Sequence, residues 1–451
     1  MCISVFLTKV RHHKEKPAVI FNQQVYDYKW LCQREDFYTA QLTCDGVQAG
    51  SVVFLIADYS PLSLSLFLAL MRLSVIIVPI TYKHYEKKDD YLGIINPDFI
   101  IEVTPNEEVN LAKCNSSAEH SELIRELQIR KTAGLIIFSS GSTGKCKAIV
   151  HDLALLLQGV NPSRDQLKVL SFLLFDHIGG INSTLNSLIS GNCIVVPKTR
   201  TPMDVAESIA RNKVDVLITS PSFLNLMLIS GVFEHTNMNC LKQINYGSEV
   251  MPSVLLDRLI QHCPKTKFIQ AYGLSELGVI RTKTNNHESS LITITDQNIT
   301  YRIRNNKLEI KSNTSMLGYL NAPKPFTEDG WFMTGDVVEV VGDSLRILGR
   351  DSDLINVGGE KVFPVEIENV LLQIPEVQDA TVYGEKNALL GNIIVAKIKS
   401  RHGVNQSSLK ELVRKFCLMK MPAFKVPQKF QIVSEISYGE RYKKIRHKPT
   451  N

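Results

Sequence analysis

Several functional classes lack their characteristic patterns in this sequence of 451 residues. Its nine cysteines include no CxxC pair, which argues against a zinc ribbon or a dithiol redox site. The 51 basic and 45 acidic residues leave a net charge of +6 without a long basic run, so no nucleic-acid partner is expected. The scattered thiols are typical of small buried side chains in a reducing cytoplasm.

A membrane-length run of uncharged apolar residues is also missing. The nearest approach is the stretch 62–80, which Arg72 interrupts. Its second half contains Pro79 and the β-branched residues 75–78, a pattern that predicts a buried helix followed by a strand. Residues 1–7 have neither a leading basic region nor a cleavage site, so they do not predict a signal peptide. We therefore expect a cytoplasmic protein without a membrane span.

Short apolar strands alternate with amphipathic helices over most of the chain, which predicts α/β layers. One helix begins with Thr201 as its cap and Pro202 at its first position, and it leads into a strand at 214–218. The other predicted strands of this part are 52–56, 135–138, 194–196, 243–246 and 268–271. After residue 308 the strands become turn-rich, and helices follow at 365–372 and 409–418. We predict two domains, 1–350 and 351–451.

A run of hydroxyl and glycine residues follows the predicted strand 135–138. It consists of Ser139, Ser140, Gly141, Ser142, Thr143 and Gly144, with Lys145 and Lys147 directly behind. Glycine lets the backbone approach a polyanion, and hydroxyl and amide groups donate to phosphate oxygens. The spacing differs from the GxxxxGK(S/T) loop of nucleoside triphosphatases. Taken alone, the run fits a phosphate loop or a polar surface turn.

The run resembles the signature loop of the acyl-activating, adenylate-forming superfamily, with Cys146 replacing its proline and Ala148 its final glycine. That superfamily includes acyl- and aryl-CoA synthetases, amino-acid adenylation domains and firefly-type luciferases. The resemblance covers about 18–446. It implies a large N-terminal α/β domain and a small mobile C-terminal α+β domain. The implied reaction uses ATP and Mg²⁺ to convert a carboxylic acid to acyl-AMP, followed by transfer to the thiol of CoA or of a phosphopantetheine carrier protein.

Two further motifs are similar to the nucleotide site of this superfamily. The residues Tyr272, Gly273, Ser275 and Glu276 match its pattern Tyr-Gly-x-Ser/Thr-Glu. Tyr272 presents a ring face on which adenine can stack, and Glu276 offers a hard oxygen ligand for Mg²⁺. The same resemblance places three residues beside the adenine and acyl pockets: Gly247, Ser248 and Glu249.

The segment 330–336 resembles the superfamily pattern Gly-Trp-x-x-Thr-Gly-Asp. A carboxylate can accept hydrogen bonds from both ribose hydroxyls, so the resemblance assigns Asp336 to the ribose. It also assigns Arg350 to the ribose and Asp351 to the hinge. Gly358 and Gly359 correspond to the loop beside the thiol channel, in a form closer to the CoA synthetases than to peptide-synthetase domains.

The C-terminal motif matches least well. Aligning Arg446 with the final arginine of the superfamily places Lys443 on the catalytic lysine and Tyr442 on a glycine, with Lys444 as the second choice. His177 resembles the histidine that borders the acyl carboxylate, and Asp176 is then expected to cap the following helix. No covalent enzyme nucleophile is required.

Two other interpretations remain open at this stage. Asp176 also resembles the aspartate with which amino-acid adenylation domains hold a substrate amino group, so a stand-alone amino-acid-activating domain is one alternative. The replaced residues Cys146, Ala148 and Tyr442 allow a nucleotide-binding protein that has lost ligase activity. The identity of the acid and the choice between CoA and a carrier protein are left undetermined.

Overall fold

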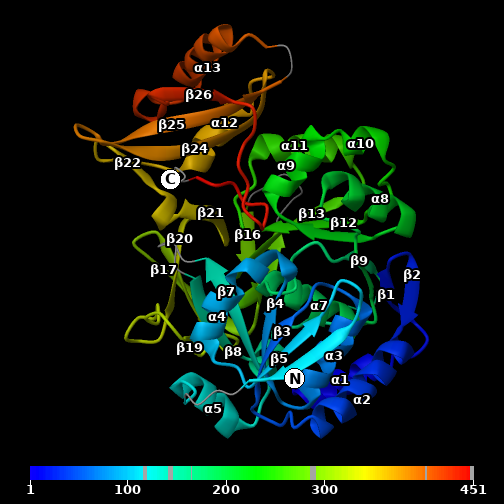
Figure 1. Cartoon of the computed structure of the whole chain (residues 1–451). Helices are drawn as coiled ribbons and strands as arrows, with labels where there is room; N and C mark the ends of the chain where they lie inside the picture. The colour runs from blue at the N-terminus through cyan, green and yellow to red at the C-terminus, as the bar shows by residue number, and fades with distance from the viewer. Residues whose placement is uncertain (115–118, 141–145, 164, 285–290, 402–403, 447–451) are drawn as a thin grey trace.

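The computed structural model describes residues 1–114, 119–140, 146–163, 165–284, 291–401 and 404–446. Within these residues the strands form four sheets. Three belong to a large N-terminal region, and the fourth lies in a small C-terminal domain at the top of Figure 1. This arrangement confirms the predicted fold class.

Two sheets form the centre of the large region, the first largely parallel and the second mixed. The first has the order β14 (Gly278–Ile280), β13 (Lys267–Leu274), β12 (Gln243–Gly247), β11 (Val216–Thr219), β9 (Lys168–Leu170), β10 (Cys193–Val195), β1 (Pro17–Phe21) and β2 (Gln24–Asp27). The second has the order β19 (Gly318–Tyr319), β8 (Cys146–Asp152), β7 (Gly134–Ser140), β4 (Ile76–Ile80), β3 (Val52–Ile56), β5 (Phe99–Val103) and β6 (Val109–Lys113).

Helices cover these sheets because each presents an apolar face. They are α1 (Ile3–Arg11), α2 (Tyr28–Cys44), α3 (Pro61–Arg72), α4 (Lys88–Ile95), α5 (Glu122–Arg130), α6 (Leu153–Leu156), α7 (Ile178–Ser190), α8 (Pro202–Asn212), α9 (Pro221–Ile229), α10 (Val232–His235) and α11 (Ser253–His262), with the short 3₁₀ helix η1 (Tyr82–Lys87). Thr201 caps α8 by accepting from the amide of Asp204, as predicted. The predicted helix and strand at 62–80 are α3 and β4, and no described helix combines the length and apolarity that a membrane crossing requires.

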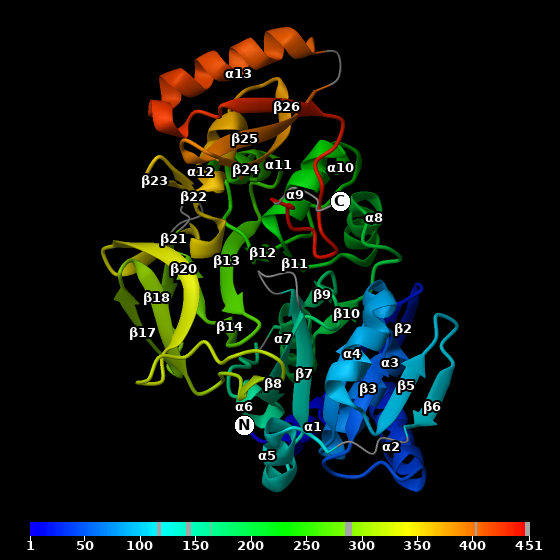
Figure 2. The same ribbon diagram turned by 60° about the vertical axis from the view of Figure 1, so that its left-hand side comes forward.

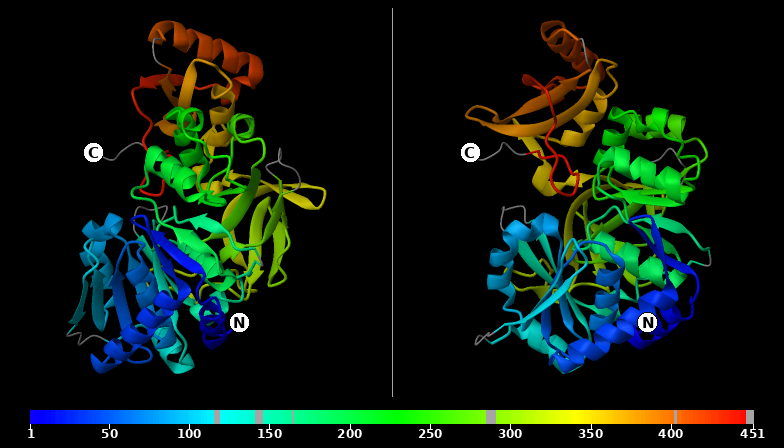
Figure 3. Two further views of the ribbon diagram at one scale, coloured as in Figure 1. Left: turned by 90° about the vertical axis from the view of Figure 1, so that its right-hand side faces the viewer. Right: turned by 45° about the vertical axis from the view of Figure 1, so that its right-hand side comes forward.

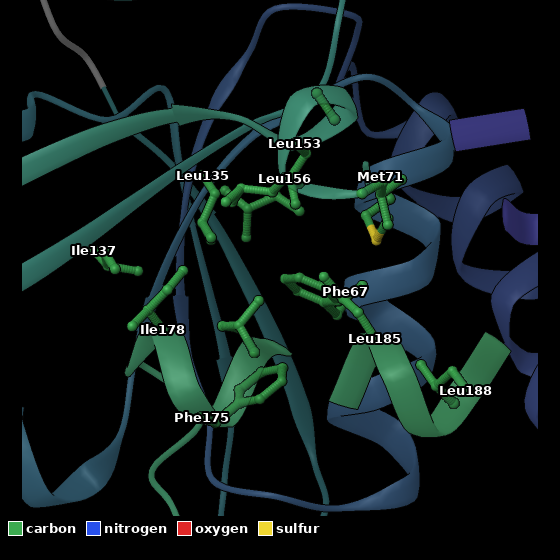
Figure 4. Packing of buried hydrophobic residues seen from close by; sticks show 14 of the residues in the cluster. Phe67, Met71, Leu135, Ile137, Leu153, Leu156, Phe175, Ile178, Leu185 and Leu188 are labelled. Carbon is green, nitrogen blue, oxygen red and sulfur yellow. The ribbon is translucent and has the colours of Figure 1, made fainter. Parts of the chain in front are cut away.

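The largest core lies where α3 and α7 pack against β7. Figure 4 shows Phe67 of α3, Leu135 of β7 and Leu185 of α7 directed toward one another. All three are at most 2% exposed. The close packing fixes α7, which His177 directly precedes, relative to β7, which leads into the predicted phosphate loop.

The third sheet is antiparallel and has the order β15 (Thr282–Thr284), β16 (Leu291–Ile294), β21 (Ser344–Arg350), β20 (Phe332–Val341), β18 (Lys307–Ser312) and β17 (Ile299–Arg304). Figure 2 shows it beside β13 on one flank of the molecule. Its strand β21 ends at Arg350, and the 3₁₀ helix η2 (Asp351–Asp353) follows. The predicted domain boundary, between Arg350 and Asp351, falls at this point and stays a prediction.

The C-terminal domain has its own core. Its sheet comprises β23 (Glu360–Val362), β22 (Ile355–Val357), β25 (Gly391–Ser400) and β24 (Val377–Asn387), with β26 (Lys429–Val433) paired to β25. The helices α12 (Pro364–Leu371) and α13 (Gln406–Lys420) and the 3₁₀ helix η3 (Ala423–Lys425) complete the domain. Ile367, Ile394 and Val413 are fully buried together in its core.

After β26 the chain leaves the C-terminal domain as residues 434–446, which we call the Lys443 segment. Figures 1 and 3 show this red segment reaching into the large region beside α9. All nine cysteines are free thiols. The expectation that they are buried holds for Cys32, Cys193, Cys263 and Cys417, whereas Cys2 and Cys44 are exposed.

Candidate active site

Two parallel strands bring the Gly247 and Tyr272 motifs together. In the register of β12 and β13, Gly247 is paired with Ala271. A side chain at Gly247 would place its Cβ 2.5 Å from the Ala271 carbonyl oxygen, so only glycine fits there. Tyr272 and Gly273 lie within β13, which extends to Leu274. The prediction that this strand ends at residue 271 was therefore wrong by three residues.

A buried carboxylate joins the Tyr272 and Arg350 motifs. The Tyr272 hydroxyl donates to Asp336 Oδ2 at 2.6 Å, and Arg350 Nε lies 2.9 Å from Asp336 Oδ1. Asp336 and Arg350 are paired directly in the β20–β21 register. Burial raises the pKa of Asp336, and the Arg350 charge and the Tyr272 hydroxyl offset part of this increase. Three separate motifs thus converge on one point, which we call the ribose corner.

Glu276 lies in the turn that follows β13. Its Oε1 accepts from the Tyr319 hydroxyl at 2.7 Å, and Lys147 Nζ lies 5.0 Å from the centre of the Tyr319 ring. The second carboxylate oxygen offers a hard ligand. No group of three or more metal-ligating side chains occurs among the described residues, so a bound Mg²⁺ would take its other ligands from phosphate oxygens and water.

His151 supports the adjacent backbone. Its Nε2 donates to the carbonyl oxygen of Ser275 at 2.7 Å, and the side chain is fully buried. Burial lowers the pKa of His151 to about 4, so the neutral ring makes this bond at neutral pH. The residue therefore positions the turn that carries Ser275 and Glu276. Sequence reasoning gave no indication of this role, because His151 belongs to no motif.

The start of the predicted phosphate loop continues β7. Ser139 and Lys147 are paired in the β7–β8 hairpin, and Ser140 is the last residue of β7. The predicted phosphate ligands Gly141, Ser142, Thr143 and Gly144 lie outside the described residues. Arg441, on the Lys443 segment, donates from Nη2 to the carbonyl oxygen of Phe138 at 3.0 Å. The C-terminal domain thus touches the strand that leads into this loop.

The two candidate lysines have different surroundings. Lys444 Nζ donates to Asp379 Oδ1 at 2.8 Å and to the Ala380 carbonyl at 2.7 Å, which anchors it in the C-terminal domain. Burial lowers the pKa of Lys443, whereas the charges of Glu249 and Asp336 raise it. Lys443 is therefore buried and within electrostatic range of Asp336 in the ribose corner.

Glu249 connects the Lys443 segment to the large region. Its two carboxylate oxygens accept from the amide groups of Ser222 at 3.3 Å and Lys444 at 3.2 Å. Ser248, beside it, has φ = 68°, a left-handed conformation that is uncommon for a residue with a side chain. The strained turn and the two bonds hold Gly247, Ser248 and Glu249 at the end of β12.

His177, rather than Asp176, caps α7. Its Nδ1 accepts from the Gly179 amide at 3.2 Å. The expectation that Asp176 caps this helix was wrong, because its Oδ2 accepts from the amide and hydroxyl of Thr81 and from His84 Nδ1. Burial lowers the pKa of His177 well below its ordinary value, and the nearby charges of Arg441 and Lys443 lower it further. His177 is therefore neutral and close to the Lys443 segment.

A small hollow of mixed polarity lies along the same helix. The apolar residues Ile178, Ile181 and Leu277 line it together with the polar side chains of Asn182 and Thr314. The hollow borders the turn and strand that follow Glu276.

The hinge and thiol-channel residues lie at the edge of the C-terminal domain. Lys307 Nζ lies 2.8 Å from Asp351 Oδ2, which ties the first residue of η2 to β18. Gly358 and Gly359 form the β22–β23 turn with φ values of +60° and +95°. These left-handed conformations favour glycine, and the Gly358 amide donates to the Leu390 carbonyl at 2.9 Å.

The fold is that of adenylate-forming enzymes, and the chain belongs to the family of AMP-binding enzymes. The model of the AMP-binding enzyme matches residues 6–314, and that of its C-terminal domain matches 366–438. The chain is 27% identical over 342 residues to a 2-succinylbenzoate–CoA ligase of Bacillus licheniformis, covering 70% of this chain and 69% of that protein. It is 26% identical to a 3,4-dihydroxybenzoate–[aryl-carrier protein] ligase of Bacillus anthracis, covering 67% and 70%. The fold matches the o-succinylbenzoate CoA synthetase of Bacillus subtilis with its acyl-adenylate, with a TM-score of 0.78, 21% identity and coverage of 99% and 97%.

Proposed function

We propose that this protein is an AMP-forming acid–thiol ligase. It activates a carboxylic acid with ATP as acyl-AMP, releases pyrophosphate, and passes the acyl group to the thiol of CoA or of a carrier protein. The observation that carries the proposal is the convergence of Tyr272, Asp336 and Arg350 at one buried corner, with Lys443 brought to it from the C-terminal domain.

In this proposal the ribose corner holds the nucleotide. Asp336 accepts from the ribose hydroxyls while Arg350 keeps its carboxylate ionised and oriented. The Tyr272 ring, with the backbone at Gly247, Ser248 and Gly273, forms the adenine slot. The residues of the loop 139–144 and Lys147 hold the phosphates. Ser275 and Glu276, in the turn after β13, lie on the other side of the phosphates.

Lys443 serves the first half-reaction. The acid carboxylate must approach the α-phosphate, and two unit negative charges 4 Å apart repel by about 4 kcal/mol at an effective dielectric near 20. A lysine between them replaces this repulsion by attraction and stabilises the charge that develops in the in-line transition state. A Mg²⁺ ion held by Glu276 would neutralise the departing pyrophosphate.

The acid and the thiol acceptor are proposed only as chemical classes. The neutral His177 borders the acid carboxylate, and the remainder of the acid lies along α7. Rotation about Asp351 would bring Gly358 and Gly359 to the thiol for the second half-reaction. One matched relative is named as a CoA ligase and another as a carrier-protein ligase, so both acceptors belong in the test. Nine free thiols fit a cytoplasmic location.

Neither alternative from the sequence is carried forward. Asp176 Oδ2 accepts from Thr81 and His84, and the side chain is only 4% exposed, which leaves little access for a substrate amino group. The replaced residue Tyr442 does not keep the Lys443 segment out of the site, because Arg441 contacts the Phe138 carbonyl. A lost catalytic apparatus is therefore not needed to explain the poor match of the last motif.

The decisive experiment is pyrophosphate exchange with ATP over a panel of fatty, aromatic and amino acids. We expect exchange that depends on the presence of one class of plain carboxylic acid. Asp336→Ala removes the acceptor that Tyr272 and Arg350 share, so it should raise the KM for ATP about tenfold or more. The exposed Asp343→Ala is the matched control. Binding of ATP without exchange for any acid would overturn the proposal.

A further inference from the structure

Three consecutive side chains before Lys443 contact the large region. Glu440 Oε2 lies 2.6 Å from His84 Nε2 and 3.6 Å from Lys87 Nζ. Arg441 donates to the Phe138 carbonyl, and the Tyr442 hydroxyl donates to the Arg200 carbonyl at 2.6 Å. These contacts attach the Lys443 segment at three separate points.

Tyr442 occupies the position where the superfamily pattern has glycine. Its φ of 53° lies in the left-handed region, and its amide donates to the Gly439 carbonyl in a tight turn. Its ring packs against Phe172 and Phe223, with centroids 5.5 and 4.9 Å away. The strained backbone is therefore offset by contacts with the large region, so the residue serves to dock the segment.

His84 continues the Glu440 contact inward. Its Nδ1 lies 2.6 Å from Asp176 Oδ2, and the side chains of His84 and Asp176 are 8% and 4% exposed. Asp176 is itself fixed by the amide of Thr81 at 3.0 Å and the Thr81 hydroxyl at 2.8 Å. A carboxylate accepts hydrogen bonds but does not donate them, so His84 donates from both ring nitrogens when it holds Asp176 and Glu440 together.

The two ends of this series of hydrogen bonds, Asp176 and Glu440, lie on different parts of the molecule. Asp176, Thr81 and His84 are all part of the large region and move with it. Glu440 lies on the Lys443 segment, which is continuous with the C-terminal domain. If the C-terminal domain rotates between the two half-reactions, as the proposed function requires, the Glu440–His84 contact breaks and Asp176–His84 stays in place.

We propose that His84 and Glu440 are a positioning pair that docks the Lys443 segment for acid adenylation and contributes nothing to thiol transfer. The inference rests on the proposed function, since it assigns the contact to the first of two half-reactions. Glu440 is three residues from Lys443, and the Gly439 amide donates to the Lys443 carbonyl at 2.8 Å, so a shift of one moves the other. Small displacements of a positioned group lower reaction rates steeply.

The kinetic test separates the two half-reactions. Glu440→Ala and His84→Ala should each lower the maximal rate of pyrophosphate exchange about 10- to 100-fold, with the KM for ATP nearly unchanged. Thioester formation from acyl adenylate supplied in advance should proceed at the wild-type rate or faster. Glu440→Gln keeps an acceptor for His84 and should restore part of the exchange rate. The exposed Glu435→Ala, on the same segment, is the matched control.

Amide hydrogen exchange tests the docking without relying on catalysis. The amides of Tyr442 and Lys444 donate to the Gly439 carbonyl and to Glu249, so they should exchange faster in Glu440→Ala than in Glu435→Ala. Equal exchange in the two variants, or an equal loss in both half-reactions, would overturn the inference. A wild-type protein that forms no acyl-AMP would overturn the proposed function, while faster amide exchange in Glu440→Ala would still support docking by this pair.

Discussion

The ribose corner and the Lys443 segment are held in different ways. Backbone pairing in β20–β21 sets Asp336 opposite Arg350, and β13 delivers Tyr272 to the same point. The Lys443 segment is placed by side chains that reach across to the other domain, among them Glu440 and Tyr442. The difference teaches that one part of the site is preorganised by its sheets, whereas the other is assembled when the domains meet.

Lys444 and Lys443 offer the sharpest test of this contrast within one segment. Lys444→Ala would leave the Asp379 carboxylate, 1% exposed, without its closest cation. Removing one partner of a buried ion pair costs about 3–5 kcal/mol, so we expect the C-terminal domain to unfold at much lower urea concentration. Circular dichroism and tryptic digestion over a urea series measure this change. A stable variant would show that Lys444 does not anchor the domain.

Lys443→Ala should act on chemistry and leave folding nearly intact. Removing a group that stabilises transition-state charge typically lowers the rate about 10²- to 10³-fold, and we expect a loss of this size in pyrophosphate exchange. ATP binding, measured by calorimetry, should change little because the ribose corner is intact. The exposed Lys415→Ala on α13 is the control. An unchanged exchange rate would remove Lys443 from the mechanism.

We expect the stability of the large region to depend on pH through His151, which supports the turn that carries Ser275 and Glu276. The pKa of His151 is lowered to about 4 in the folded state from about 6.5 in the unfolded chain, so its contribution to stability is complete above pH 6.5 and is lost as the pH falls toward 4. At 1.36 kcal/mol per pKa unit, acidification from pH 7.5 to 5 should cost about 2 kcal/mol from this group.

The comparison is between urea unfolding of the wild type and of His151→Gln at both pH values. Glutamine keeps an N–H donor for the Ser275 carbonyl and does not titrate, so the variant should lose less stability on acidification. The exposed His262→Gln should behave like the wild type. Parallel pH profiles for the wild type and His151→Gln would contradict the assignment of this group.

Local patterns were sufficient to predict the strands that lead to the phosphate loop, to Gly247 and to Tyr272. The predicted strands at 52–56 and 243–246 are β3 and β12 to within one residue, because β-branched and apolar runs bounded by turn residues depend only on neighbours in the chain. The predicted end of β13 was too early, since pairing with β14 carries the strand through Tyr272 and Gly273. Antiparallel pairing with a later segment is not a local property.

The sequence did not predict which residues far apart in the chain contact one another. Asp176 looked like a helix cap, yet its hydrogen-bonding partners Thr81 and His84 lie more than 90 residues earlier in the chain. Tyr319 and Arg441 carried no motif, although they contact Glu276 and the strand before the phosphate loop. Such partners become visible only when the sheets have packed.

The sequence by itself determined the layered fold, the order of the nucleotide motifs and the family, because these depend on residue types at fixed local spacings. Only the tertiary structure gave the two adjacent lysines different surroundings. Lys444 donates to Asp379 and Ala380 of the C-terminal domain, whereas the charges of Glu249 and Asp336 act on Lys443. These partners lie far from both lysines in the chain, so no local pattern could separate the two.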